Sequence, residues 1–329
     1  MPLNRRTLLL AAPAALLATP RLAVGQAAGA GDFPNRPVRV VIGFPPGGGI
    51  DTIARPTFQR VGDRLGQPCV VDNRAGNNGN IAMDHVAKSP PDGYTVFFGN
   101  VGNYTTHALF PNLGFDTLRD FSYISQVTFG PLVIAVRADF PAQTLQELMA
   151  MARARPGALN FASGGSGGVP HFAFEVWRQQ MGLDIVHVPY RGSGPAFQDL
   201  LGGRVQLMVD GYGVVRGAHE AGRVRVLAIT SGRRHPNLPD VPTAMEAGVP
   251  GFEFVSWTAW AAPAGTPEPI RKRLEDAMGW VMENTDLPRV ILSFGTFPQF
   301  DTGANVRTRL ERDREVWARI AREARIVAD

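Results

Sequence analysis

The sequence lacks the features that mark several protein classes. Its 329 residues contain one cysteine, Cys69, so neither an internal disulfide framework nor a lipid-attachment cysteine near the N-terminus is expected. Cys69 lies in a short apolar run, where a small buried core residue is expected rather than a reactive thiol. Cysteines, histidines and carboxylates show no metal-site spacing, so we expect no metal and no other cofactor.

Long apolar segments and an excess of charge are also missing. Beyond the N-terminal 28 residues, no stretch is apolar for the roughly 20 residues that a transmembrane helix needs. The chain has 33 basic and 29 acidic residues, and loss of an N-terminal segment with Arg5, Arg6 and Arg21 leaves 30 against 29. A nearly neutral chain gives no electrostatic reason to expect a nucleic-acid partner.

Residues 1–27 have the three parts of a secretory signal peptide. Arg5 and Arg6 precede a short apolar run and then small and polar residues, with cleavage expected between Gly25 and Ala28. The arginine pair and the leucines after it are similar to a twin-arginine signal, and export by the general secretory route stays open. We therefore expect export to the periplasm and a soluble protein after cleavage.

The rest of the chain alternates strand patterns with helix patterns. Residues 38–44 are almost continuously apolar, as in a strand buried on both faces, and apolar residues then recur at helical spacing from Ile50 to Leu65. Repetition of this order predicts an α/β fold with mostly parallel sheets and right-handed crossovers. Roughly 300 mature residues exceed what one core usually organises, so two lobes are expected.

Two glycine-rich loops each follow a predicted strand and open a predicted helix. Residues 45–51 read Pro-Pro-Gly-Gly-Gly-Ile-Asp, and residues 163–171 read Ser-Gly-Gly-Ser-Gly-Gly-Val-Pro-His. Glycine allows close approach to backbone N–H groups, and a helix start adds the positive end of its dipole. Together the loops could hold a carboxylate from both sides. The first loop is neither a Walker A sequence nor a dinucleotide fingerprint, and taken alone it fits an ordinary turn equally well.

The second loop leaves an enzymatic alternative open. Gly164 to Gly168 match Gly-x-Ser-x-Gly, which is typical of the nucleophile elbow of a serine hydrolase with Ser166 as nucleophile. Such a hydrolase needs an acid and a histidine further along the chain, and the later candidates stand in no recognisable motif. His171 fits the first turn of the following helix. Hydrolysis is therefore the alternative, and a non-enzymatic binding protein is the main expectation.

Other polar residues stand where predicted strands end, and ligands bind at the carboxyl ends of strands in open α/β sheets. Turn capping explains any one of them better, and Asp51 also fits a helix-start carboxylate, but their shared location favours a ligand site. The full set of predicted ligand-binding residues is Phe44, Pro46, Gly47, Gly48, Asp51, Asn100, Asn103, Thr105, Ser163, Gly164, Gly165, Ser166, His171, Tyr190 and Asp210.

Ordered motifs along essentially the whole mature chain resemble one family. Residues 33–51 lead from Phe-Pro-Asn-Arg-Pro-Val-Arg into the first glycine loop, residues 91–95 read Pro-Asp-Gly-Tyr-Thr, and residues 187–192 read His-Val-Pro-Tyr-Arg-Gly. Residues 262–267 read Ala-Pro-Ala-Gly-Thr-Pro. The chain resembles the Bug-type extracytoplasmic solute receptors, which are the substrate-binding proteins of tripartite tricarboxylate transport.

This resemblance implies a type II periplasmic-binding-protein fold with a strand hinge. Residues 32–134 and 255–329 would form lobe 1, and residues 135–254 would form lobe 2. The resemblance further implies a small organic carboxylate held between the two glycine loops, and no catalysis. The implied partners are the membrane subunits of a tripartite tricarboxylate transporter or a sensor kinase, and we expect a monomer.

The chain departs from the family pattern at two places. Residues 75–79 read Ala-Gly-Asn-Asn-Gly where the family usually has Pro-Gly-Ala-Gly-Gly, and in the second loop Gly168 replaces a hydroxyl donor while Pro170 removes a backbone donor. Neither glycine loop contains Arg or Lys to hold a second carboxylate. The sequence therefore leaves both aromatic monocarboxylates and dicarboxylates open as ligands.

Overall fold

The computed structural model describes residues 33–326, and the predicted signal peptide lies outside the described residues. The strands are β1 (Val38–Ile42), β2 (Cys69–Asn73), β3 (Thr95–Asn100), β4 (Phe121–Pro131), β5 (Val133–Arg137), β6 (Asn160–Ser163), β7 (Val186–Pro189), β8 (Leu207–Asp210), β9 (Val224–Ile229), β10 (Val255–Pro263) and β11 (Phe297–Thr302). The helices are α1 (Gly49–Leu65), α2 (Asn80–Ala87), α3 (Val101–Tyr104), α4 (Leu145–Ala154), α5 (Val169–Gln180), α6 (Ser193–Leu201), α7 (Tyr212–Glu220), α8 (Glu268–Asn284), α9 (Leu287–Ser293) and α10 (Gly303–Glu323), with short 3-10 turns η1 (Asn77–Gly79) and η2 (Thr106–Ala108).

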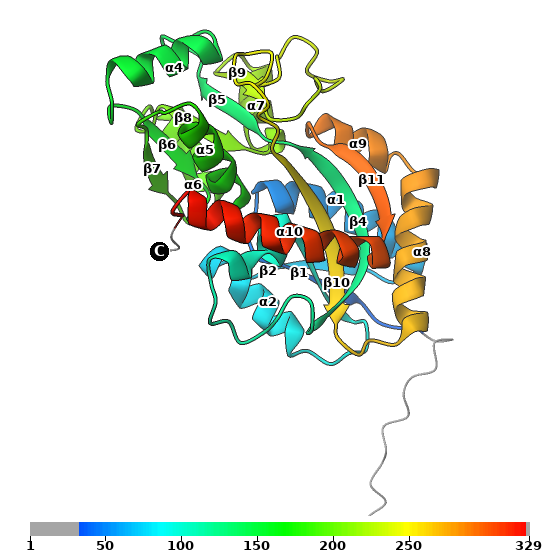
Figure 1. Ribbon diagram of the computed structural model, residues 1–329. Helices are drawn as coiled ribbons and strands as arrows, with labels where there is room; N and C mark the ends of the chain where they lie inside the picture. Colours follow the sequence, from blue (N-terminus) through cyan, green and yellow to red (C-terminus); the bar gives the residue numbers. More distant parts are fainter. Residues whose placement is uncertain (1–32, 327–329) are drawn as a thin grey trace, which may run out of the picture. The chain divides into compact units, whose positions relative to one another are not determined.

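The strands form two separate sheets with helices packed around them (Figure 1). One sheet has the order β11-β4-β10-β3-β1-β2, and the other has the order β7-β6-β8-β5-β9. The α/β class and the two-lobe organisation are confirmed, but both sheets are mixed rather than mostly parallel. In the first sheet β1 runs parallel to β2 and β3, whereas β10 runs antiparallel to β3 and β4 because it returns the chain from the second sheet.

Two segments of the chain run side by side from one sheet to the other (Figure 1). On the outward path β4 runs into β5 with only Leu132 between them. On the return path the chain passes Phe254 into β10. The buried Thr230 hydroxyl holds both paths, because it accepts a hydrogen bond from the Leu132 N–H at 2.8 Å and donates to the Phe254 carbonyl at 2.5 Å. The sheets are thus joined by strands, as the resemblance implied.

Helix α1 fixes the first glycine loop to the first sheet. Its buried face contains Ile50, Phe58 and Leu65 at the predicted spacing, and it ends at Gly66, whose left-handed φ of 76° suits a residue without Cβ. Phe58 makes edge-on contacts with Phe98 and with a tryptophan of β10, each at 5.2 Å between ring centroids. The start of α1 is therefore anchored by a rigid aromatic core.

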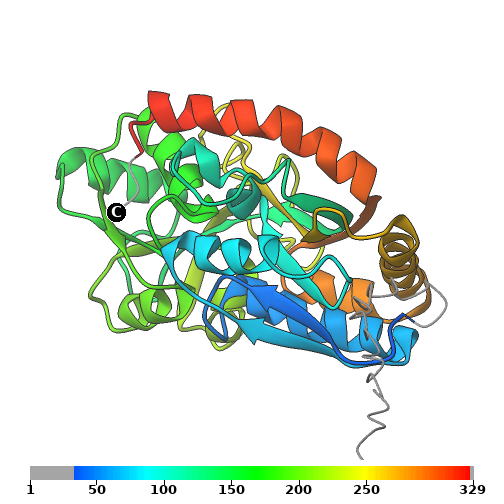
Figure 2. The same cartoon turned by 90° about the horizontal axis from the view of Figure 1, so that it is seen from below.

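Helix α10 ties the last part of the chain to both sheets (Figure 2). Trp317 packs on Phe172 of α5, with ring centroids 4.5 Å apart, and on Phe254 of the return path. On its outer side α10 forms ion pairs such as Arg314 with Asp116 at 2.9 Å, which agrees with the mixed charges of its sequence. Within residues 33–326, no helix is both long enough and apolar enough to cross a bilayer.

Sequence patterns missed β4, β11, α3, α7 and α9, and β4 shows why. This strand is buried but interrupted by Ser125, Gln126 and Thr128, so it does not read as an apolar run. Cross-strand partners satisfy two of these side chains: the Trp260 indole N–H donates to the Ser125 hydroxyl at 2.6 Å, and the hydroxyls of Thr128 and Thr258 lie 2.7 Å apart. The Gln126 amide pairs instead with Arg309 of α10 and with the Thr128 carbonyl of its own strand. Burial of a polar residue that has a partner costs little, so hydrophobicity alone cannot reveal such a strand.

Candidate ligand-binding site

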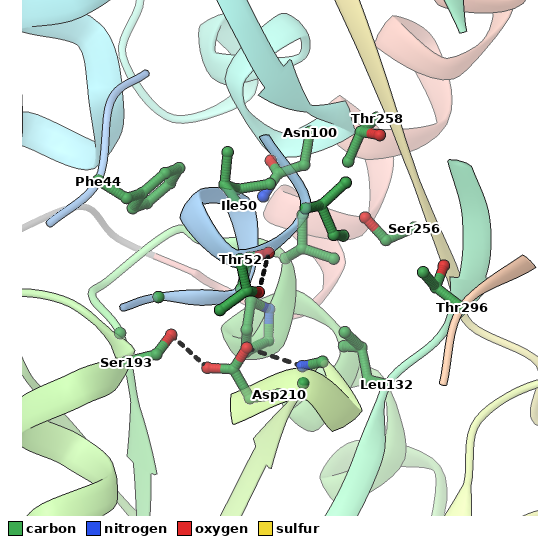
Figure 3. Close-up of a pocket in the computed structure, with 18 of the residues that line it drawn as sticks. Phe44, Ile50, Thr52, Asn100, Leu132, Ser193, Asp210, Ser256, Thr258 and Thr296 are labelled. Carbon is green, nitrogen blue, oxygen red and sulfur yellow. Dashed lines mark hydrogen bonds between the residues drawn. The ribbon is translucent and has the colours of Figure 1, made fainter. Parts of the chain in front are cut away.

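A cleft lies at the carboxyl ends of strands from both sheets (Figure 3). Its walls include Phe44 after β1, Asn100 at the end of β3, Gly164 after β6 and Asp210 at the end of β8. The space open to water-sized molecules is about 110 Å³. Open α/β sheets bind ligands at this position, because loops that follow neighbouring strands meet there.

Four helices begin in this cleft. The first residues of α1, α5, α6 and α7 are Gly49, Val169, Ser193 and Tyr212, and all four line it. In none of these four described helices does an N-cap side chain accept a hydrogen bond from the first turn. Each helix start carries about half a positive charge and up to four unpaired N–H groups. The helix starts therefore bring positive partial charge to the cleft, although no Lys, Arg or His is among its described lining residues.

Asp210 is the carboxyl group of this cleft. The residue is 7% exposed. One oxygen, Oδ1, accepts the Gly211 N–H at 2.7 Å, and Oδ2 accepts the Ser193 hydroxyl at 2.5 Å. Burial raises the pKa of Asp210 to about 6, and these two hydrogen bonds oppose the rise only in part. Figure 3 shows the side chain directed between the loops that begin α6 and α7.

The remaining walls combine apolar surface with hydroxyl groups (Figure 3). The apolar side chains are Phe44, Ile50, Ile53, Leu132, Val169 and Phe294, and the hydroxyl-bearing residues are Thr52, Thr128, Ser193, Tyr212, Ser256, Thr258 and Thr296. Small-molecule sites have this character: apolar contacts surround a carbon skeleton, and a few polar groups fix its orientation. This arrangement suits a small anion with a carbon body.

Six of the fifteen predicted site residues line the cleft. They are Phe44, Gly48, Asn100, Gly164, Gly165 and Asp210. Pro46 and Gly47 belong to the same loop as Gly48 but lie outside the lining set. The other seven predicted residues are also outside it, and their contacts indicate what each of them does instead.

Asp51 braces the first glycine loop from behind. It accepts the Gly47 N–H at 3.0 Å, the Asn73 amide at 2.9 Å and two hydrogen bonds from the Arg55 guanidinium at 2.9 and 2.7 Å. Burial pushes the pKa of Asp51 upward, but the hydrogen bonds from Arg55, Gly47 and Asn73 outweigh it and leave the pKa below 3.8. Asp51 thus orders the loop and leaves its outer N–H groups free for the cleft.

Asn103 and Thr105 are buried behind Asn100. Asn100 and Asn103 form a reciprocal capping box at the start of α3, and the Thr105 hydroxyl donates to the Val101 carbonyl at 2.8 Å. The Asn103 amide also donates to the Asn78 carbonyl at 2.9 Å. These residues therefore position Asn100 and Asn78, which do line the cleft.

The second glycine loop is braced by Ser163, which is fully buried. Its hydroxyl donates to the Gly165 carbonyl at 3.1 Å and lies 2.6 Å from His187 Nε2. His171 stacks on His187 with ring centroids 3.9 Å apart, and its Nδ1 accepts the Gly167 N–H at 3.0 Å. This network holds the loop against the second sheet.

Three of the predicted residues have neighbours outside the cleft. Ser166 and His171 line a separate depression with Glu175 and Arg178, not the cleft. Tyr190 donates from its hydroxyl to Asp199 at 2.7 Å. The second loop therefore faces the cleft with backbone atoms at Gly164, Gly165 and Gly168, whereas its Ser166 side chain belongs to the other depression.

Sequence reasoning missed most of the cleft, because only six of its 29 described lining residues were predicted. The starts of α6 and α7, the hydroxyls of β4 and β10, residues 294–296 and Asn78 were not predicted as site residues. The first two had a readable signal, because Gly-Ser-Gly at residues 192–194 and Asp-Gly at residues 210–211 also stand between a strand and a helix. The remaining residues come from distant segments and carry no local motif.

Two mixed α/β sheets, paired crossing strands and a cleft at the strand ends define a two-lobed periplasmic binding protein. The sequence matches the family model of the tripartite tricarboxylate transporter family receptor over residues 53–324. This chain belongs to that family and is a periplasmic solute-binding receptor. The resemblance to Bug-type receptors is confirmed by curated relatives and by solved structures.

Two curated relatives illustrate the match. A UPF0065 protein from the tcbD-tcbE intergenic region of Pseudomonas sp. strain P51 is 37% identical over 298 residues, which cover 90% of this chain and 89% of the relative. Protein BugT of Bordetella pertussis is 34% identical over 293 residues, which cover 88% of this chain and 90% of the relative.

Solved structures agree with the fold. The R. palustris protein Rpa4515 with adipate has a TM-score of 0.87 at 34% identity, over 90% of this chain and 99% of the other. MatC from Rhodopseudomonas palustris with bound malate has a TM-score of 0.82 at 32% identity, over 88% and 99%. The periplasmic binding protein BugD has a TM-score of 0.85 at 29% identity, over 90% and 100%.

Proposed function

We propose that this protein captures a small organic carboxylate between the loops that begin α1 and α5 and delivers it to a membrane transporter or a sensor. The observation that carries the proposal is the convergence of four helix starts without capping side chains on one cleft whose described lining contains no basic residue. Backbone N–H groups at helix starts bind carboxylates without a charged side chain. The adipate and malate in two related structures support the same ligand class.

The proposed cycle is closure of two lobes around the ligand. We place lobe 1 in residues 32–134 and 255–329 and lobe 2 in residues 135–254, with the hinge where the crossing strands are tied by Thr230. Contacts that span the cleft support this division. The Asn78 amide donates to the Gly167 carbonyl at 3.1 Å, and the Arg216 guanidinium donates to the Ser293 carbonyl at 3.0 Å. We also propose that the receptor is exported, is monomeric and has no catalytic activity.

Calorimetry of the mature protein, residues 28–329, tests the ligand class. We expect heat of binding with at least one member of a panel of mono-, di- and tricarboxylates, and none with the matching amides. Ligand that binds only the folded state should also raise the melting temperature with concentration. If the amide binds as well as its carboxylate, the proposed electrostatic capture is wrong.

A matched pair of glycine variants tests the second loop. Gly165 has a φ of 144° and lines the cleft, whereas Gly222 has a φ of 68° and stands outside its described lining. An added Cβ has space at both positions, so Gly165→Ala and Gly222→Ala impose backbone strain without a severe clash. We expect Gly165→Ala to weaken carboxylate binding about tenfold or more and Gly222→Ala to leave it unchanged. Equal affinity of the two variants would remove the second loop from the site.

A further inference from the structure

Asp210 occupies a position where an anion would otherwise bind. It accepts hydrogen bonds at the start of α6, from Ser193, and at the start of α7, from Gly211. It also faces α1, because a Cβ added at Gly49 would lie 3.9 Å from its Oδ1. The protein's own carboxylate therefore lies at the starts of α6 and α7, with a hydroxyl donor from α6 and a backbone N–H donor from α7. A ligand carboxylate is left with α1 and α5.

Asp210 retains unused hydrogen-bonding capacity. An ionised carboxylate has about four acceptor positions, and two donors reach this one among the described residues. Because the residue is 7% exposed and lines the cleft, bulk water satisfies the rest only while the cleft is open. A ligand that closes the cleft must supply the missing donors or leave a buried carboxylate underpaired, which is costly.

A second carboxylate would meet unfavourable surroundings here. Like charges at close range oppose each other's ionisation, and no Lys, Arg or His among the described lining residues offsets them. With a pKa of about 6, Asp210 is mostly ionised at neutral pH even without a ligand. Its negative charge therefore affects which ligands can bind.

We propose that the preferred ligand has one carboxylate, held by the starts of α1 and α5, and a hydroxyl or ammonium group that donates to Asp210. This inference rests on the proposed function and adds the chemical class of the ligand. Hydroxy acids and amino acids with a short apolar skeleton fit it, because the described lining also contains the apolar residues Ile50, Ile53 and Leu132. A plain dicarboxylate fits less well.

Matched ligands measure this preference by calorimetry at pH 7. For each chain length from about three to seven carbons, the set contains the alkanoate, its hydroxy and amino derivatives and the dicarboxylate. We expect a donor-bearing member to bind about tenfold or more tightly than the alkanoate and the dicarboxylate of equal length, as a charge-assisted hydrogen bond allows. Tightest binding of a dicarboxylate would overturn the inference and leave the proposed function standing. Absence of binding by every carboxylate would overturn both.

Two variants assign the preference to Asp210. Asp210→Asn keeps the shape and one acceptor oxygen but removes the charge, whereas Asp240→Asn removes an exposed charge outside the described cleft lining. We expect Asp210→Asn to abolish the advantage of the donor-bearing ligand and to improve dicarboxylate binding relative to the alkanoate. Asp240→Asn should keep the wild-type order. An unchanged order in a folded Asp210→Asn variant, with folding checked by circular dichroism, would overturn the inference.

Discussion

The buried charge of Asp210 should contribute less to the stability of the empty receptor at neutral pH than in mild acid. Burial raises its pKa from 3.8 to about 6, so between these values the folded state binds a proton that the unfolded state releases. Stability linked to this group is therefore full below pH ~4 and falls as the pH rises through ~6. The difference between the two pKa values corresponds to about 3 kcal/mol at pH 7.

Asp210→Asn removes this effect, because the amide is uncharged at every pH. We expect the variant to unfold with a free energy up to about 3 kcal/mol higher than wild type at pH 7, and with no advantage at pH 4. Urea unfolding of ligand-free proteins at pH 4, 5, 6 and 7 measures the difference. Subtraction of the two proteins cancels the other carboxyl groups, including Asp51, whose lowered pKa has the opposite effect on stability.

The control for this experiment is Asp240→Asn, which changes an exposed carboxyl group and should give a difference near zero at each pH. A stability difference between wild type and Asp210→Asn that is the same at pH 4 and pH 7 would refute the reasoning. Asp210 would then be solvated and ordinary, and its charge would have no place in the energetics of the cleft.

Three other predictions follow from the same geometry. Gly49→Ala should keep or slightly raise the melting temperature of the free protein, since the new methyl group makes only contacts of 3.7 and 3.9 Å. It should weaken ligand binding, because the methyl group fills the cleft beside Asp210. Thermal unfolding checks the first effect and calorimetry the second. Asn78→Gly keeps the left-handed φ of 50° but loses the hydrogen bond across the cleft, so stopped-flow should show faster ligand release, whereas Asn77→Gly, at an exposed residue with φ of 46°, should not. Burial raises the pKa of Cys69 from 9.0 to about 12. At pH 8 a thiol reagent should therefore label native protein about 50-fold more slowly than urea-unfolded protein. Equal labelling rates would show that the fold does not raise the pKa of this thiol.

Local sequence patterns predicted the parts of this fold that depend on local rules. The strand at residues 38–44, the apolar face of α1 and the two glycine loops all follow from periodicity and from the backbone freedom of glycine. The loops were placed correctly at strand ends because their signal, a strand followed by glycine and a helix, needs no tertiary information. The half-buried state of Cys69 shows the limit, since its run of apolar neighbours predicted full burial but β2 lies at a sheet edge.

The orientation of each side chain around the loops did not follow from sequence. Asp51, Asn103 and Ser163 were predicted as ligand contacts because they are polar and stand at strand ends, yet each hydrogen-bonds to the backbone of a loop at the cleft and lies outside the lining itself. Local pattern does not distinguish a polar residue that holds a loop from one that faces the ligand. The two roles differ by the direction of one side chain, which tertiary packing decides.

The same reasoning explains why the chemistry of the cleft is hard to read from sequence. Its positive charge comes from helix starts, so the residues that provide it are glycines, Val169 and Ser193 rather than Lys or Arg. Asp210 is the one charged residue among the described residues that line the cleft, and it is acidic. A sequence search for an anion site would reject it, because such a search looks for basic residues. Its role follows from its position at the starts of α6 and α7, where it accepts one hydrogen bond from each. In the proposed site the starts of α1 and α5 are left for a ligand. In our proposal, charge placed in the backbone and opposed by one carboxylate attracts an anion and still distinguishes one carboxylate from two.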